Sequence, residues 1–281
     1  MKQGIVFKEK AAIIIISSVF VAMIALLLAC ASQPARTYLQ PLPHSPWGDN
    51  YSYRYDPTEK KPTASVPATI IVVNPMYKEI EESALRERIY SKVGKGFSAS
   101  MGVDMDKIIV AKGMTSKGPY SSLEDVTYSD KKISDLTLAP KVYISTDIKY
   151  GRMETYSGYN QERQFTTRYK RSFDMKIGAW ISFAMQEPLS GQKMWVKKLD
   201  LEDITMSGEE YSESRRQYNS RGQFIGYGEK EIVYDGRTDA MANALKQMYP
   251  IIMQKCWTYM DTEEILSLKD KVKEIRELKR Y

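Results

Sequence analysis

Cys30 is the residue whose type and position most clearly predict a chemical modification. Lysines begin the chain, an uncharged apolar run extends from Ala11 to Leu28, and the sequence Leu27-Leu28-Ala29-Cys30 closes it. A basic start, an apolar stretch and a small residue at the cleavage point are the features of a secretory signal peptide. A cysteine directly after that small residue is typical of the bacterial lipobox, in which the thiol is diacylated and the peptide is cut before it. We therefore predict a signal peptide over residues 1–29 and a lipid anchor at Cys30.

The alternative for this stretch is a retained transmembrane helix, because the 18 residues from Ala11 to Leu28 are just long enough to span a bilayer. A Pro-rich stretch follows Cys30, where a stop-transfer sequence would have a cluster of Lys and Arg, and this favours the lipoprotein. Ala31, in place of the Asp that marks inner-membrane retention in enteric bacteria, favours the outer membrane. Two or more acyl chains make such an anchor stable. We expect a protein held on the bacterial outer membrane by its lipid without spanning it.

A basic and aromatic segment between residues 163 and 171 is the second candidate for chemistry. Arginine binds carboxylates through two parallel hydrogen bonds, and aromatic rings stack on the faces of sugars, so a sialylated glycan would suit such a segment. The alternative is a charged flank on the strand that begins near Phe173. The candidate ligand-binding residues are Arg163, Arg168, Tyr169, Lys170 and Arg171.

The remaining residue types argue against most enzyme chemistry. His44 is the single histidine and lies in a linker, and Cys256 lies in an apolar helical pattern, so a His-based triad or a zinc site is not expected. The letters G-x-G-x-x-A occur at 94–99, but the dinucleotide fingerprint requires a strand before them, and here a helix is predicted before them. We therefore expect no enzyme activity, no cofactor and no metal.

Net charge and cysteine content limit which binding partners and which disulfides are expected. The predicted signal peptide holds three lysines and one glutamate, so its removal lowers the net charge from +6 to +4. A mildly basic surface suits anionic lipid, nucleic acid or acidic glycans, although solubility alone explains it, and we expect no nucleic-acid partner. With Cys30 acylated, only Cys256 remains, which leaves no intrachain disulfide. For Cys256 we favour a buried thiol over a disulfide to another chain.

The hydrophobic patterns along the chain predict an α+β fold, in which a mixed β-sheet has helices packed on one face. The predicted strands and helices would position the residues named above. Residues 69–73 form a buried strand, 79–93 a helix and 107–111 a second strand, which together make a β-α-β unit. Further strands are predicted at 142–150 and 173–185, and a turn at 187–191 leads to a hairpin partner at 193–201, while the polar stretch 120–135 is expected to hold a short helix and a loop.

Two long polar segments rich in Tyr and Arg, 151–171 and 205–230, resist assignment and are either projecting hairpins or mobile loops. A helix is predicted over 239–260, which Pro250 should kink or split. The last helix carries an apolar stripe that either docks on the domain or pairs with another chain as an oligomer contact. That stripe consists of Ile265, Leu268, Val272 and Ile275.

The predicted organisation has four parts: a signal peptide at 1–29, a lipidated Pro-rich linker at 30–68, an α+β domain at 69–260 and a C-terminal amphipathic helix at 261–281. Seven of the twelve prolines lie in the linker, so it should be an extended and semi-rigid tether. Its aromatic residues are unusual for a spacer and are expected to pack on the domain or on the membrane interface. They are Trp47, Tyr51, Tyr53 and Tyr55.

Several motifs, in their order and spacing, resemble the neuraminyllactose-binding haemagglutinin (HpaA) lipoproteins of Helicobacter and relatives. The resemblance implies an outer-membrane or flagellar-sheath lipoprotein, described as an adhesin for sialylated glycans. The family's compact Lys/Arg run before the long strand has no counterpart here, so only the lipidation at Cys30 carries over. The motifs are Leu27-Leu28-Ala29-Cys30, Tyr55-Asp56-Pro57-Thr58-Glu59-Lys60, Val73-Asn74-Pro75, Glu187-Pro188-Leu189-Ser190-Gly191, Leu199-Asp200-Leu201-Glu202-Asp203-Ile204, Asp239-Ala240-Met241-Ala242-Asn243-Ala244-Leu245 and Ile252-Met253-Gln254.

Two functions follow as hypotheses. The first is an outer-membrane lipoprotein adhesin of the haemagglutinin type, which binds sialylated host glycans. The second is a structural lipoprotein of the periplasmic face or flagellar sheath, which binds envelope proteins through its last helix and its long polar segments.

Overall fold

The computed structural model describes residues 37–48, 50–57, 65–79 and 84–279. The predicted signal peptide and Cys30 lie outside the described residues. The strands are β1 (Thr69–Val73), β2 (Met76–Glu79), β3 (Thr115–Tyr120), β4 (Leu136–Leu138), β5 (Lys141–Tyr159), β6 (Phe165–Gln186), β7 (Lys193–Asp200), β8 (Ile204–Tyr218), β9 (Phe224–Tyr227) and β10 (Glu231–Asp235). The helices are α2 (Ala84–Ala111), α3 (Tyr128–Ile133), α4 (Gly236–Tyr259) and α5 (Thr262–Lys279).

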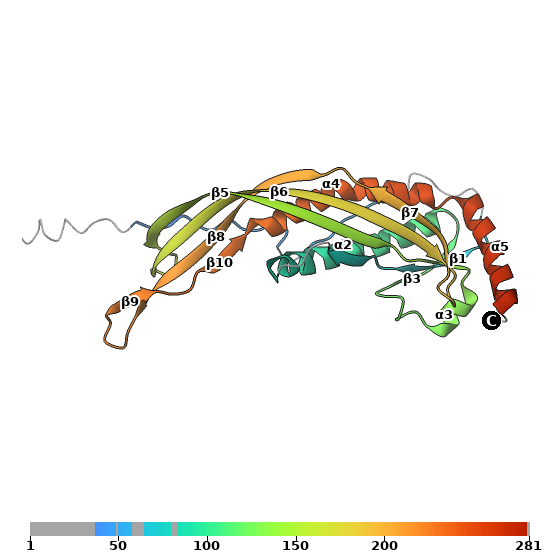
Figure 1. The fold of residues 1–281 in the computed structure, drawn as a ribbon, viewed down its shortest axis with the longest axis horizontal. Helices are drawn as coiled ribbons and strands as arrows, with labels where there is room; N and C mark the ends of the chain where they lie inside the picture. Colours follow the sequence, from blue (N-terminus) through green and yellow to red (C-terminus); the bar gives the residue numbers. More distant parts are fainter. Residues whose placement is uncertain (1–36, 49, 58–64, 80–83, 280–281) are drawn as a thin grey trace, which may run out of the picture.

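The fold is α+β with a mixed sheet, as predicted, and β6 is the strand around which it is built (Figure 1). One edge of β6 pairs antiparallel with β5 and then β4, and its other edge pairs antiparallel with β8 and then β7. The pairs β1–β3, β1–β4 and β2–β5 are parallel. The long strands β5, β6 and β8 run together to one end of the molecule, and α5 lies at the other end.

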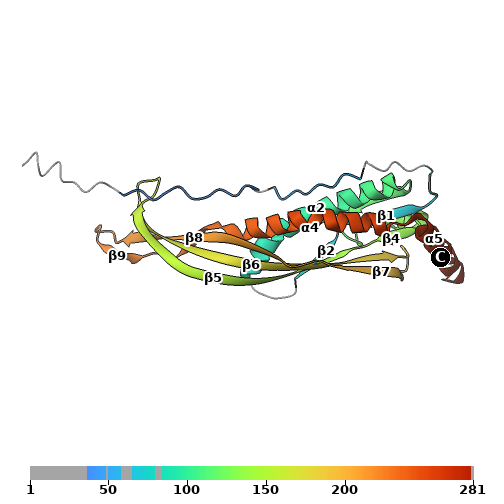
Figure 2. The same cartoon turned by 90° about the horizontal axis from the view of Figure 1, so that it is seen from above.

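Helices α2 and α4 lie on the same side of the sheet (Figure 2), as the predicted layering requires. The alternating apolar residues of β6 face this side. This alternation is why the strand could be predicted from the sequence. In α4 the apolar residues repeat at helical spacing and are fully buried. The β6 members of this core include Phe173, Met175, Ile177, Ile181, Phe183 and Met185, and the α4 members include Met241, Leu245, Met248, Ile252 and Cys256.

The prediction of a strand at 107–111 is wrong, because these residues form the last turns of α2. Ile108 and Ile109 continue a buried stripe with Met101 and Met105 at helical spacing. A short run of β-branched residues is ambiguous between strand and helix, and here the stripe decides in favour of the helix. The β-α-β unit nevertheless exists, because β3 is parallel to β1 and follows α2 directly.

The helix predicted over 79–93 extends beyond residue 93, because α2 runs through both Gly94 and Gly96. Gly96 is the point where the tether crosses α2. A Cβ atom there would lie 2.0 Å from the backbone oxygen of Tyr51, so only glycine admits the crossing. The G-x-G-x-x-A letters at 94–99 therefore lie inside a helix, and the dinucleotide fingerprint is excluded.

The two unassigned segments are regular strands rather than loops. Residues 151–171 complete β5 and begin β6 through a turn at 160–164, and residues 205–230 contain β8, a turn at 219–223 and β9. Much of β5 and β9 is exposed, and the buried positions of β6 and β8 in these segments are polar, so the segments carry no apolar alternation from which a strand could be predicted.

The C-terminal helices follow the prediction in part. Helix α4 runs through Pro250 without splitting. The stripe of α5 is buried on the protein's own domain at Ile265, Leu268 and Val272, so it is occupied within the single chain. Cys256 is fully buried, and burial raises the pKa of its thiol to about 12. The buried thiol is thus confirmed.

The tether packs on the domain along the outer side of α2 and α4 (Figure 2). The Tyr53 ring lies 5.3 Å from that of Phe97 and 5.4 Å from that of Tyr249. Trp47 donates its indole N–H to Asn243 Oδ1 of α4 at 3.1 Å. The tether aromatics were predicted to pack either on the domain or on the membrane interface, and these contacts show that Trp47 and Tyr53 pack on the domain.

Asp104 of α2 fastens the tether and α4 together, and we expect Asp104→Ala to lower the free energy of unfolding by about 2 kcal/mol. Its side chain is 2% exposed and accepts hydrogen bonds from the Tyr249 hydroxyl and the Tyr55 backbone N–H, each at 2.7 Å. Denaturant unfolding followed by circular dichroism measures the loss. Asp125→Ala, which removes an exposed carboxylate from a loop, is the control, and equal losses would contradict the role given to Asp104.

Candidate functional site

A pocket lies between the first described residues of the tether and the far ends of β5 and β6. The backbone N–H of Leu39 donates to the Tyr159 oxygen at 2.9 Å, and the N–H of Tyr159 donates to the Thr37 oxygen at 3.0 Å. These bonds hold the tether as a short parallel bridge along β5. The tether then leaves the edge of β5 and passes over the sheet, and the space beneath it is the pocket.

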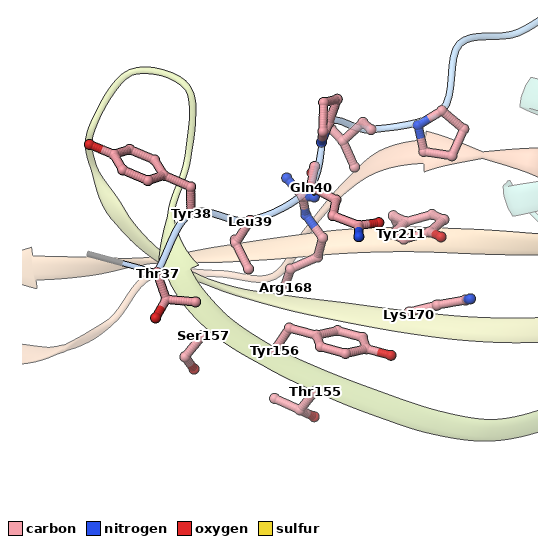
Figure 3. A pocket seen from close by; sticks show the side chains of 13 residues that line it. Thr37, Tyr38, Leu39, Gln40, Thr155, Tyr156, Ser157, Arg168, Lys170 and Tyr211 are labelled. Carbon is pink, nitrogen blue, oxygen red and sulfur yellow. The ribbon is translucent and has the colours of Figure 1, made fainter. Parts of the chain in front are cut away.

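The pocket has a volume of about 770 Å³, which is within the range of small-molecule sites. Tether residues form one wall, and the other wall is made by side chains of β5, β6 and β8 (Figure 3). The described lining holds two cationic side chains, three hydroxyl-bearing rings and no carboxylate. The lining residues are Thr37, Tyr38, Leu39, Gln40, Pro41, Leu42, Pro43, Thr155, Tyr156, Ser157, Arg168, Lys170 and Tyr211.

Arg168 holds the pocket together from β6. Its guanidinium donates to Glu213 Oε1 of β8, with the Nε contact at 2.8 Å, and its Nη1 donates to the backbone oxygen of Gln40 in the tether. The side chains of Arg168 and Glu213 are 8% and 9% exposed. Because most of its hydrogen-bonding capacity is used within the protein, Arg168 positions the tether rather than offering a free guanidinium.

Lys170 is the more accessible cation of the pocket. Its Nζ lies 2.7 Å from Glu209 Oε1, and Glu209 Oε2 also accepts a hydrogen bond from the Tyr211 hydroxyl at 2.7 Å. The hydrogen bond to Glu209 raises the pKa of Lys170, and the same contact lowers the pKa of Glu209. Both groups are therefore charged at neutral pH, and the Lys170 side chain remains 29% exposed.

Tyr156 adds an accessible aromatic ring to the pocket wall from β5. The residue is 45% exposed, and its hydroxyl donates to Glu154. This hydrogen bond raises the pKa of the phenol, so the ring stays neutral. A neutral tyrosine ring beside a lysine offers a stacking face together with a cation, which is the combination that an acidic sugar would use.

The structure does not bring the five sequence-predicted residues into one site. Arg168 and Lys170 line the pocket, whereas the alternation of β6 directs Tyr169 and Arg171 to its opposite face. There the Lys230 ammonium lies 4.3 Å from the Tyr169 ring, and the Arg171 guanidinium lies 4.1 Å from the Tyr150 ring. Arg163 is in the turn between β5 and β6.

Sequence reasoning missed Tyr156, Tyr211 and the tether wall. Tyr156 and Tyr211 lie in the two segments that resisted assignment. A signal for those segments was present, because both turns begin with Asn and end with Gln four residues later. In each turn the Asn side-chain oxygen accepts from the Gln backbone N–H at 2.9 Å, which marks 160–164 and 219–223 as matching hairpin turns.

Two further findings concern metals and membranes. Within the ranges that the structure describes, no group of three or more His, Cys, Asp or Glu side chains is arranged to hold a metal ion. The helices of those same ranges include none that is long and apolar enough to cross a membrane, and the run from Ala11 to Leu28 lies outside them.

Comparison with known proteins shows distant likeness of fold. No protein-family model and no curated protein matches the chain. A Helicobacter pylori protein described as a neuraminyllactose-binding hemagglutinin homolog matches with a TM-score of 0.47 and 11% identity, over 79% of this chain and 98% of its own. A Xanthomonas campestris protein of the DUF330 family matches with a TM-score of 0.25 and 12% identity, over 77% of this chain and 95% of its own. The lipoprotein GNA1162 of Neisseria meningitidis matches with a TM-score of 0.20 and 12% identity, over 50% and 85%.

All three likenesses have TM-scores below 0.5 and concern the fold alone. At such identities and TM-scores, the comparison does not indicate a ligand.

Proposed function

We propose that the chain is a lipoprotein anchored in the bacterial outer membrane through Cys30, of the haemagglutinin or adhesin type, and that the pocket beneath its tether binds sialylated glycans. The observation that carries this proposal is the pocket itself, in which Lys170 meets the rings of Tyr156 and Tyr211 at the end of the sheet where the tether begins. The lipobox-like sequence at Leu27-Leu28-Ala29-Cys30 supports the anchor.

The lining explains how an acidic sugar would be recognised. The Lys170 ammonium supplies a point charge for the sugar carboxylate, and the exposed face of Tyr156 supplies a stacking surface. Because Glu209 already neutralises Lys170, we expect weak binding of one glycan, with strength gained from many copies on a cell surface.

Lys170→Ala is expected to weaken binding to immobilised sialylated glycans by about tenfold or more, since it removes a charge-assisted hydrogen bond. The measurement uses the purified protein on a glycan array, before and after sialidase treatment of the glycans. Lys176→Ala is the matched control, because Lys176 lies on the same strand, also pairs with a carboxylate, and is not among the residues that line the pocket.

Binding that survives sialidase, or equal losses for the two lysine variants, would overturn the glycan site. The anchor is tested separately by Cys30→Ser, which is expected to abolish the incorporation of labelled palmitate into the protein.

A further inference from the structure

The end of the sheet farthest from α5 exposes a cluster of large apolar side chains, which we term the distal cluster. Its members lie at the end of β8, in β9 and beside the turn at 219–223. Its three aromatic members lie close to one another, since the centre of the Phe224 ring is 6.1 Å from that of Tyr218 and 5.4 Å from that of Tyr227. Contiguous exposed apolar groups of this kind usually mark an interaction surface. The members and their exposed fractions are Tyr218 53%, Phe224 51%, Ile225 61% and Tyr227 52%.

Basic side chains surround the distal cluster. Arg215, Arg216 and Arg221 are exposed, and the sequence from Ser214 to Gly228 contains no acidic residue. The Arg216 guanidinium lies 3.9 Å from the Phe165 ring of β6 and 5.6 Å from the Phe224 ring, so it joins the ends of the two hairpins. Aromatic rings interleaved with arginine are the composition of protein segments that lie at a membrane–water interface.

The neighbouring turn contributes a further arginine under backbone strain. Arg163 has φ 61°, and the equivalent position of the matching turn is Gly222, with φ 73°. The left-handed conformation is costly for a residue with a side chain and free for glycine. Arginine in place of glycine at this position indicates that the side chain is used, and it adds a cation to the same end of the molecule.

The position of the tether shows which surface this end meets. Thr37, the first described residue, is hydrogen-bonded to Tyr159 at the end of β5, next to these turns (Figure 2). Cys30 precedes Thr37 by seven residues, so even a fully extended chain places them at most ~25 Å apart. A lipid on Cys30 therefore keeps this end of the sheet close to a bilayer, whereas α5 is at the opposite end.

We propose that the distal cluster docks on the anionic surface of the membrane that holds Cys30. In this arrangement Phe224 and Ile225 enter the headgroup layer, and Arg215, Arg221 and Arg163 contact lipid phosphates. The sheet then stands up from the membrane on its distal end. The pocket around Lys170 lies about seven strand residues from the turn, which places it roughly 20 Å above the docked turns and open to solvent. This inference rests on the lipid anchor of the proposed function.

The test compares two exposed isoleucines in the full acylated protein, reconstituted into phosphatidylcholine vesicles with and without phosphatidylglycerol. Ile225→Cys in the distal cluster and Ile251→Cys in α4 are each labelled with an environment-sensitive fluorophore, and a headgroup spin-labelled lipid serves as the quencher. Ile225 and Ile251 are 61% and 53% exposed, and the one native thiol, Cys256, is fully buried, so labelling is selective. We expect at least twofold stronger quenching at 225 than at 251, and the difference should grow with phosphatidylglycerol.

The outcomes separate this inference from the proposed function. If the protein does not float with the vesicles, the lipid anchor fails and this inference fails with it. If the protein floats but positions 225 and 251 are quenched equally, docking is overturned and the anchor stands. In the Cys30→Ser protein expressed from residue 30, which carries neither acyl chains nor the signal peptide, Arg221→Ser is expected to weaken vesicle association about fivefold. Lys255→Ser, an exposed lysine of α4, should leave it unchanged, and equal effects would count against docking.

Discussion

Arg276→Met is expected to lower the free energy of unfolding by about 3 kcal/mol, because it leaves a buried carboxylate without its partner. Arg276 of α5 donates through Nε to Glu187 Oε1 at 3.0 Å, and the side chain of Glu187 is 0% exposed. Its Nη groups also donate to the backbone oxygens of Lys131, Lys132 and Ser134, at 2.9 to 3.2 Å. One side chain thus fastens α5 to the turn after β6 and to the end of α3.

The dependence of the free energy of unfolding on pH in the acid range should also depend on the contact between Arg276 and Glu187. Burial opposes the ionisation of Glu187, but hydrogen bonds from Ser190 and Leu189, with a smaller contribution from Arg276, outweigh burial and lower the pKa of the carboxyl below its ordinary 4.5. A carboxyl whose pKa is lower in the folded protein stabilises it fully above pH 4.5, and this stabilisation is lost as the pH falls through the folded value. We expect Arg276→Met to reduce this part of the pH dependence, because the hydrogen bonds from Ser190 and Leu189 remain, and the two proteins should differ most above pH 4.5.

Urea unfolding of the two proteins across this range measures both effects. Lys273→Met is the matched control, because Lys273 lies one turn earlier in α5, is 62% exposed and pairs with an exposed Asp270 at 3.3 Å. Exposed pairs of this kind contribute from about 0 to 1 kcal/mol. Equal losses for the arginine and lysine variants at neutral pH would show that Glu187 does not depend on Arg276.

Local patterns in the sequence predict the core of this fold because the core obeys local rules. The alternation from Phe173 to Met185 and the stripes of α4 and α5 each bury one face, so period and burial agree. The strand predicted at 107–111 was wrong because a run as short as Ile108-Ile109-Val110 fits either a buried strand or a buried helix. The choice depended on a buried stripe that begins earlier in α2, at Val93, Phe97 and Met101.

The pocket could not be predicted in the same way, because it depends on contacts between distant parts of the chain. Arg168 meets Gln40 across 128 positions of sequence, and no local pattern announces that contact. A composition rule gathered Arg168, Tyr169 and Arg171 as one group, although a strand sends neighbours to opposite faces. Had the matching turns at 160–164 and 219–223 been recognised, the alternation would have separated these residues correctly.

Arg168→Met is expected to lower the free energy of unfolding by about 4 kcal/mol, since both members of the Arg168–Glu213 pair are buried and the variant leaves Glu213 uncompensated. The variant also removes the hydrogen bond to Gln40, so the tether should become accessible to protease near residue 40. Denaturant unfolding and limited proteolysis measure the two effects.

The double variant Arg168→Met with Glu213→Met distinguishes two roles for Arg168 in the pocket, namely positioning the tether and contacting the sugar directly. Replacing both buried charges by apolar side chains of similar length should recover most of the lost stability, because no unpaired charge remains. If Arg168 only positions the tether, glycan binding should recover partly with stability, since Lys170 and Tyr156 are intact. If Arg168 contacts the sugar, stability should recover while binding stays lost. We expect the first result, because the guanidinium already donates to Glu213 and Gln40 within the protein.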